Sequence, residues 1–102
     1  MKRVITQPQK SDMGSGFGRY EFEKGKTLWD FMQWYRINAN SWGVISIYNQ
    51  NNGECIRQFD YDLYDDNICY LKVSPWVYDL PLKEITFTYC FMCEDVKISL
   101  GN

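Results

Sequence analysis

The alternation of apolar and polar residues along the chain changes period several times, and each change predicts a different element. A period of two predicts short strands at Lys2–Thr6 and at Arg19–Glu23, where Tyr20 and Phe22 alternate with charged neighbours. Between these strands, residues 7–18 contain one proline and three glycines. This composition predicts a flexible loop.

One segment, from Thr27 to about Asn38, has the periodicity of an amphipathic helix. Its apolar residues recur at spacings of three and four, which places them on one stripe. The stripe consists of Leu28, Phe31, Met32, Tyr35 and Ala39. Thr27 can cap the first turn, and Asp30 stands three residues later in a variant of the capping box.

The second half of the chain reads as short strands joined by turns. The predicted strands are Trp42–Tyr48, Glu54–Tyr61, Ile68–Ser74, Glu84–Met92 and a last one through Val96, Ile98 and Leu100. Trp42–Tyr48 is apolar on both faces, which is typical of a central strand. A loop or short turn is expected at Trp76–Leu82, between two prolines, and a further turn near Glu94-Asp95.

The segment Asn51-Asn52-Gly53 predicts a hairpin turn, because Asn and Gly tolerate the positive φ that such turns require. Two registers of this hairpin are open. A two-residue turn would place Tyr48 opposite Arg57. A three-residue turn with a bulge would instead place Ile45 opposite Phe59.

These elements predict an α+β fold. We expect a mostly antiparallel sheet of five to seven short strands, with one amphipathic helix packed on a face, because short connections favour antiparallel neighbours. A chain of 102 residues is expected to form a single domain over residues 1–102.

Composition and charge argue against two classes of function, nucleic-acid binding and catalysis. The formal net charge is -2 and the basic residues are scattered, which does not favour direct binding of nucleic acid. Histidine is absent, so the usual general base and the commonest metal ligand are missing. The sequence therefore favours a protein that is not an enzyme and that carries no cofactor.

The N-terminal residues and the cysteines indicate in which cellular compartment the protein is expected. No apolar signal segment follows Met1, and the longest nearly apolar stretch is far too short to span a membrane. Four cysteines without a secretion signal indicate free thiols and a cytoplasmic location. Cys90 and Cys93 form a CxxC motif at the end of a strand. Ordinary thiols are the favoured interpretation, and a zinc site completed by Cys55 and Cys69 is the alternative.

The tract Asp60–Asn67 is acidic and contains two tyrosines. Its candidate binding residues are Asp60, Tyr61, Asp62, Tyr64, Asp65 and Asp66. One interpretation is a solvated connection, and the other is a contact surface for a basic partner protein. If residues 60 and 62 are extended, their side chains share a face about 7 Å apart, which is about the spacing of successive nucleic-acid phosphates.

The chain is rich in aromatic residues, with four Trp, eight Tyr and six Phe. Trp29, Trp34 and Trp76 fall on helix flanks or in loops, where a core does not require them. Aromatic residues are enriched at protein interfaces. We therefore predict that these tryptophans act as anchors in a protein-binding surface together with the acidic tract.

The layout of an amphipathic helix, an Asn-Gly hairpin and further short strands over about Thr27 to Leu100 resembles small accessory proteins of phages and conjugative elements. Some of these proteins are acidic inhibitors of host defence, such as anti-CRISPR proteins. The resemblance implies a non-enzymatic inhibitor or modulator of a nucleic-acid-handling host protein. The alternatives are a self-associating structural or assembly protein, and a small histidine-free enzyme or ligand-binding protein.

Overall fold

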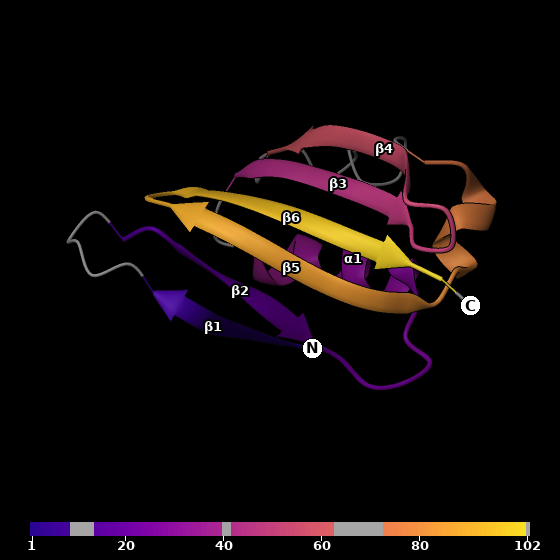
Figure 1. The fold of residues 1–102 in the computed structure, drawn as a ribbon, viewed down its shortest axis with the longest axis horizontal. Helices are drawn as coiled ribbons and strands as arrows, with labels where there is room; N and C mark the ends of the chain where they lie inside the picture. Colours follow the sequence, from indigo (N-terminus) through magenta and orange to yellow (C-terminus); the bar gives the residue numbers. More distant parts are fainter. Residues whose placement is uncertain (9–13, 40–41, 63–72, 102) are drawn as a thin grey trace.

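Six strands form one sheet, and an α-helix lies against one of its faces (Figure 1). The computed structural model describes residues 1–8, 14–39, 42–62 and 73–101. The elements are β1 (Lys2–Pro8), β2 (Gly16–Glu21), α1 (Leu28–Asn38), β3 (Gly43–Asn49), β4 (Glu54–Tyr61), the 3-10 helix η1 (Pro75–Asp79), β5 (Leu82–Cys90) and β6 (Cys93–Leu100). The predicted α+β class, with one helix packed on a sheet, is confirmed.

The sheet is mixed. Its strand order is β1-β2-β5-β6-β3-β4, and every neighbouring pair is antiparallel except β3 and β6. The parallel pair arises where two hairpins meet, because the first strand of β3–β4 lies beside the last strand of β5–β6. The sheet is therefore mostly antiparallel, as predicted, with one parallel junction between its fourth and fifth strands, β6 and β3.

Helix α1 follows the predicted stripe. Thr27 is its N-cap, and the capping box is complete because the side chains of Thr27 and Asp30 each accept from the other's backbone N–H. Leu28, Phe31, Met32 and Tyr35 are all buried against the sheet, whereas Ile37 is 80% exposed. Apolar burial on one face therefore holds the helix to the sheet.

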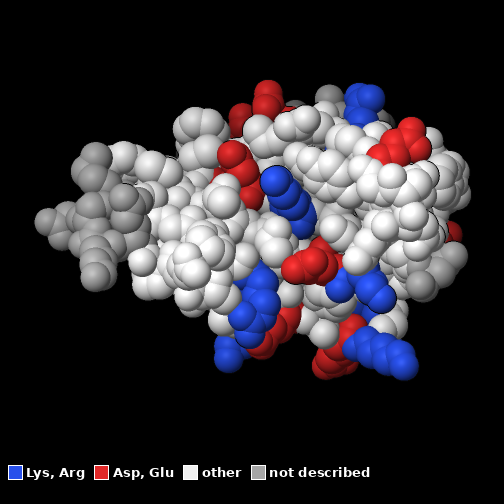
Figure 2. All heavy atoms as spheres, in the orientation of Figure 1, with Lys and Arg blue, Asp and Glu red and all other residues white. Residues whose placement is uncertain are grey.

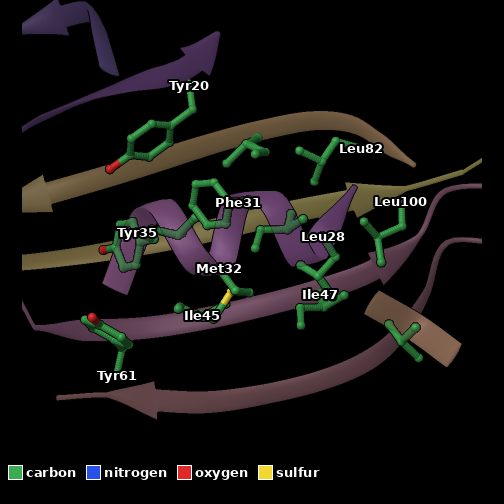
Figure 3. Packing of buried hydrophobic residues seen from close by; sticks show 14 of the residues in the cluster. Tyr20, Leu28, Phe31, Met32, Tyr35, Ile45, Ile47, Tyr61, Leu82 and Leu100 are labelled. Atoms are coloured by element: carbon green, nitrogen blue, oxygen red, sulfur yellow. The ribbon is translucent and has the colours of Figure 1, made fainter. Parts of the chain in front are cut away.

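The core lies between α1 and the sheet. Figure 3 shows helix residues meeting side chains from β2, β3, β4, β5 and β6. The aromatic part of this core gathers at one end, where the rings of Tyr20, Phe31 and Tyr35 lie edge to face or stacked, with centroids 5.2 to 6.1 Å apart. Such ring pairs add to the free energy gained from buried area.

The prediction of a loop over residues 7–18 is wrong at both of its ends. Gln7 and Pro8 extend β1, and β2 begins at Gly16; residues 9–13 lie outside the described residues. Gly18 shows the reason. A Cβ at this position would clash with the carbonyl oxygen of Val4, so glycine permits the close approach of β1 and does not mark a loop.

The β3–β4 hairpin adopts the bulged register, with Ile45 opposite Phe59 and a shift between Ile47 and Tyr48. Gly53 in its turn has φ of 71°. The 3-10 helix η1 occupies most of the predicted loop at Trp76–Leu82. The predicted strand at Ile68–Ser74 lies mainly outside the described residues; Val73 and Ser74 are not in a strand.

The β5–β6 hairpin differs from the prediction. Its turn is Phe91-Met92, because Cys90 and Cys93 pair across it. Glu94 and Asp95, predicted as the turn, belong to β6. Phe91 has φ of 56°, a left-handed conformation that sequence rules assign to Gly or Asn.

Candidate functional site

The sheet face opposite α1 holds a run of hollows at the end nearest the Phe91-Met92 turn. The largest has a volume of about 500 Å³ and is lined by Trp42, Gly43, Val44, Asp60, Tyr61, Asp62 and Cys93. Two smaller hollows continue from it: Cys93 also lines one of them, and Thr88 and Asp95 line both. The strands thus form a shallow groove, which we call the open-face groove.

Strand pairing fixes which side chains face this groove. Asp60 lies opposite Val44, Thr88 opposite Asp95 and Phe17 opposite Thr88. Paired residues in a sheet project to the same face. These paired residues therefore form a row that crosses the sheet from β4 to β2. Within this row the backbone N–H of Val44 donates a hydrogen bond to the Asp95 carboxylate at 3.1 Å.

Three large apolar side chains stand at this end of the molecule, and we call them the apolar tip: Trp42, Phe91 and Met92. They are 56%, 65% and 66% exposed. Backbone bonds hold them together, because the N–H of Trp42 donates to the carbonyl of Met92 and the N–H of Glu94 donates to the carbonyl of Trp42. The backbone of Trp42 is thus hydrogen-bonded to the β5–β6 hairpin that carries Met92.

The groove has an acidic character. Asp60, Asp62 and Asp95 are exposed along it, and Lys97 is the cation among the residues lining its three hollows. In Figure 2, which looks onto this face, the end toward the β5–β6 turn is mostly uncharged, with acidic side chains beside it. The surface therefore combines apolar side chains with negative charge.

The structure separates the residues predicted as one binding surface. Asp60 and Asp62 line the open-face groove. Tyr61 lies between them but points into the core, 4% exposed, with its ring 5.0 Å from that of Tyr35. Its prediction as an anchor is wrong, because alternation along β4 turns every second side chain toward α1. Tyr64, Asp65 and Asp66 lie outside the described residues.

The predicted tryptophans lie elsewhere. Trp29 is 44% exposed and packs edge-on against Tyr78 of η1, and Trp76 is 62% exposed on the same 3-10 helix. This end of the molecule is opposite the apolar tip (Figure 1). Trp34 is half-buried against Tyr20. None of the three therefore lines the open-face groove.

Sequence reasoning missed the apolar tip and also a buried carboxylate. Glu94 is 2% exposed on the helix-facing side of β6. Its carboxylate accepts hydrogen bonds from Tyr20 at 2.6 Å and Tyr35 at 3.4 Å, and forms an ion pair of 3.2 Å with Arg3. Arg3 lies over the rings of Phe87 and Tyr89. We call these four residues, Arg3, Tyr20, Tyr35 and Glu94, the Glu94 cluster.

The Glu94 cluster is best explained as structural. Every hydrogen-bonding side chain in it has a partner, which is what a buried polar network requires. Burial, followed by the hydrogen bond to Glu94, raises the pKa of Tyr20 well above its ordinary value. Burial and the Glu94 charge do the same to the pKa of Tyr35.

These raised values predict a loss of stability at alkaline pH. Above about pH 10 the unfolded chain releases its tyrosine protons while the folded chain keeps them, so the free energy of unfolding falls as pH rises. Tyr20→Phe with Tyr35→Phe should make that fall shallower, by up to about 1.4 kcal/mol per pH unit for each tyrosine. Urea unfolding at pH 8 to 11 measures it, and an unchanged slope would contradict the assignment.

The two cysteines of the CxxC motif, Cys90 and Cys93, form the last pair of the β5–β6 hairpin before its turn, and both line the open-face groove. Cys55, Cys90 and Cys93 are free thiols. Burial, and next the adjacent Asp95 charge, raise the pKa of Cys93, so its thiol stays protonated at neutral pH. Among the described residues, no three His, Cys, Asp or Glu side chains come together as metal ligands would. Cys69, the fourth cysteine of the zinc alternative, lies outside them.

A comparison with protein-family models, curated proteins and solved structures finds no match to this chain. Within the part of the chain that the structure describes, no helix has the length and apolarity needed to cross a membrane. The geometry of the groove, the apolar tip and the Glu94 cluster is therefore the basis for assigning a function.

Proposed function

We propose that this protein is a non-enzymatic binding module that docks a basic partner protein on the open-face groove. The observation that carries the proposal is the apolar tip, in which Trp42, Phe91 and Met92 are each more than half exposed at one end of the sheet. Apolar patches of this kind mark interaction sites. Trp, Phe and Met are also residue types enriched at protein interfaces.

The conformation of Phe91 supports the same proposal. A phenylalanine at φ of 56° is strained, and residues held in such a conformation cluster at functional sites. Gly or Asn would occupy this turn position without strain. An exposed phenylalanine there contributes little to folding, which favours a role for its side chain in binding.

The charge on the groove indicates the chemistry of the partner. Asp60, Asp62 and Asp95 give this face negative potential, which speeds association with a basic surface and is weakened by salt. Proteins that handle nucleic acid concentrate Lys and Arg on one face. We therefore propose that the module inhibits or modulates a nucleic-acid-handling host protein in the cytoplasm, where its thiols would remain reduced.

The test is the variant Phe91→Gly. It removes an exposed anchor and suits the left-handed turn, so the free energy of unfolding should stay the same or rise by up to about 1 kcal/mol. Its affinity for the partner should fall at least tenfold, as loss of a hot-spot aromatic does. Urea unfolding measures stability, and affinity capture from source-cell lysate followed by titration of the purified partner measures binding.

Trp76→Ala is the matched control, because Trp76 is equally exposed but lies on η1 at the opposite end of the molecule. It should retain the partner. A partner that binds Phe91→Gly as tightly as the unmodified protein would refute docking at the apolar tip. If the captured partner is a second copy of this chain, native mass will show a dimer, and the assembly-protein alternative replaces this proposal.

A further inference from the structure

The largest hollow of the open-face groove has the lining of a site for one cationic side chain. Trp42, a residue that is 56% exposed, lines it. Asp60 and Asp62, both exposed, also line it, together with Val44 and Cys93. An aromatic face beside carboxylates is the combination that binds a desolvated cation.

Strand register holds these groups in place. Asp60 pairs with Val44 and Tyr61 pairs with Gly43, the last pair of the β3–β4 ladder, so Trp42 and Asp62 are the residues that directly flank this pair. Trp42 is fixed in turn by its backbone hydrogen bonds to Met92 and Glu94 of the neighbouring hairpin. Asp60 lies near the end of β4 and Asp62 directly follows its last residue, and both line the hollow. Residues two apart in an extended chain are separated by about 7 Å.

We propose that this hollow binds the guanidinium of an arginine side chain, stacked on Trp42 and donating hydrogen bonds to Asp60 and Asp62. The inference rests on the proposed function, because the arginine belongs to the partner protein. Arginine fits better than lysine: its guanidinium is planar, stacks on an aromatic ring and carries five N–H donors that can reach two carboxylates. A volume of about 500 Å³ accommodates a whole side chain with its flanking backbone.

The experiment uses N-acetyl-arginine methylamide as the probe and the indole N–H signals of the four tryptophans as the readout. Titration should shift the Trp42 signal, identified with Trp42→Phe, along a saturable curve in the millimolar range. The signals of Trp29, Trp34 and Trp76 should not move. The citrulline analogue has the same shape without the charge, so it should bind about fivefold more weakly or not at all.

The matched variants change charge without changing shape. Asp60→Asn combined with Asp62→Asn should weaken probe binding about fivefold or more, because the probe loses both charged acceptors. Asp79→Asn, an exposed site on η1, should leave probe binding unchanged. The inference is wrong if citrulline binds equally well, if the double variant binds as tightly, or if a tryptophan other than Trp42 responds. Equal binding of the lysine analogue would overturn the assignment to arginine.

The two proposals fail separately. If the arginine probe binds at Trp42 but Phe91→Gly keeps the partner, the docking proposal fails and the arginine site stands. If Phe91→Gly loses the partner but the probe leaves the Trp42 signal unchanged, the docking proposal stands and the arginine site fails.

Discussion

Phe31→Ala should lower the free energy of unfolding by about 3–5 kcal/mol, because it opens a cavity in a core that can collapse only in part. Phe31 is fully buried, with 0% of its surface exposed. Its ring packs against those of Tyr20, Trp34 and Tyr35, with centroids 5.4, 6.4 and 5.2 Å away. The loss would be a large part of the stability of a typical domain.

Ile37→Ala provides the control on the same helix, because Ile37 is 80% exposed. Its urea midpoint should stay close to that of the unmodified protein. Both variants should keep the slope of unfolding free energy against urea, which reports the surface exposed on unfolding. A midpoint for Phe31→Ala equal to that of Ile37→Ala would contradict the packing of α1 on the sheet.

Elements defined by local signals could be predicted from the sequence. The stripe from Leu28 to Tyr35 and the cap at Thr27 lie within one helix, so periodicity and capping rules apply directly. The β3–β4 hairpin also follows from local chemistry, because its Asn-Gly turn lies between two apolar segments. One of the two registers considered for it is the one observed.

The pairing of distant strands could not be predicted in the same way. The parallel pair β3–β6 joins Ile45 to Val96 and Ile47 to Ile98, and no rule of local spacing connects these positions. The full extent of β1 and β2 could not be predicted for another reason. Gly16 and Gly18 resemble loop residues in a sequence, but in the sheet they allow close approach of β1 and of β5 side chains.

The candidate site was predicted only in part, and the Phe91-Met92 turn explains why. Turn rules favour polar residues and glycine, so they predict a turn at Glu94-Asp95 and a strand that includes Phe91-Met92. The observed turn breaks those rules, with φ of 56° at Phe91. Departures of this kind are expected at functional sites. The shared face of Asp60 and Asp62 could be predicted from the sequence, because residues two apart in an extended segment project to the same side.

The burial of Glu94 likewise depends on residues far away in the chain. Its partner Arg3 lies 91 positions earlier, and Tyr20 lies 74 positions earlier. Figure 3 shows the hydroxyl ends of Tyr20 and Tyr35 at the same end of the core, one from β2 and one from α1. From the sequence alone, a glutamate between two predicted strands is expected to lie in a turn. Its burial is explained only by Arg3, Tyr20 and Tyr35, which the fold brings beside it.

Glu94→Leu should lower the free energy of unfolding by about 2–4 kcal/mol. The substitution leaves Arg3 without its anion and leaves two buried tyrosine hydroxyls without their acceptor, at about 1–3 kcal/mol for each unsatisfied group. The apolar area of leucine offsets part of that loss. Urea unfolding at pH 7 measures the change.

The decisive measurement is the sign of a second substitution. With Glu94 present, Tyr20→Phe removes a hydrogen bond of 2.6 Å to the carboxylate and should destabilise the protein. In the Glu94→Leu background the Tyr20 hydroxyl is a buried donor that has lost its Glu94 acceptor. Tyr20→Phe removes this donor, so it should stabilise that variant and recover part of the lost free energy of unfolding. Glu84→Leu, on the exposed face of β5, should change stability little and serves as the control. If Tyr20→Phe has the same effect in both backgrounds, the hydroxyl and the carboxylate are energetically independent, and the Glu94 cluster does not hold β2 to β6 through this bond.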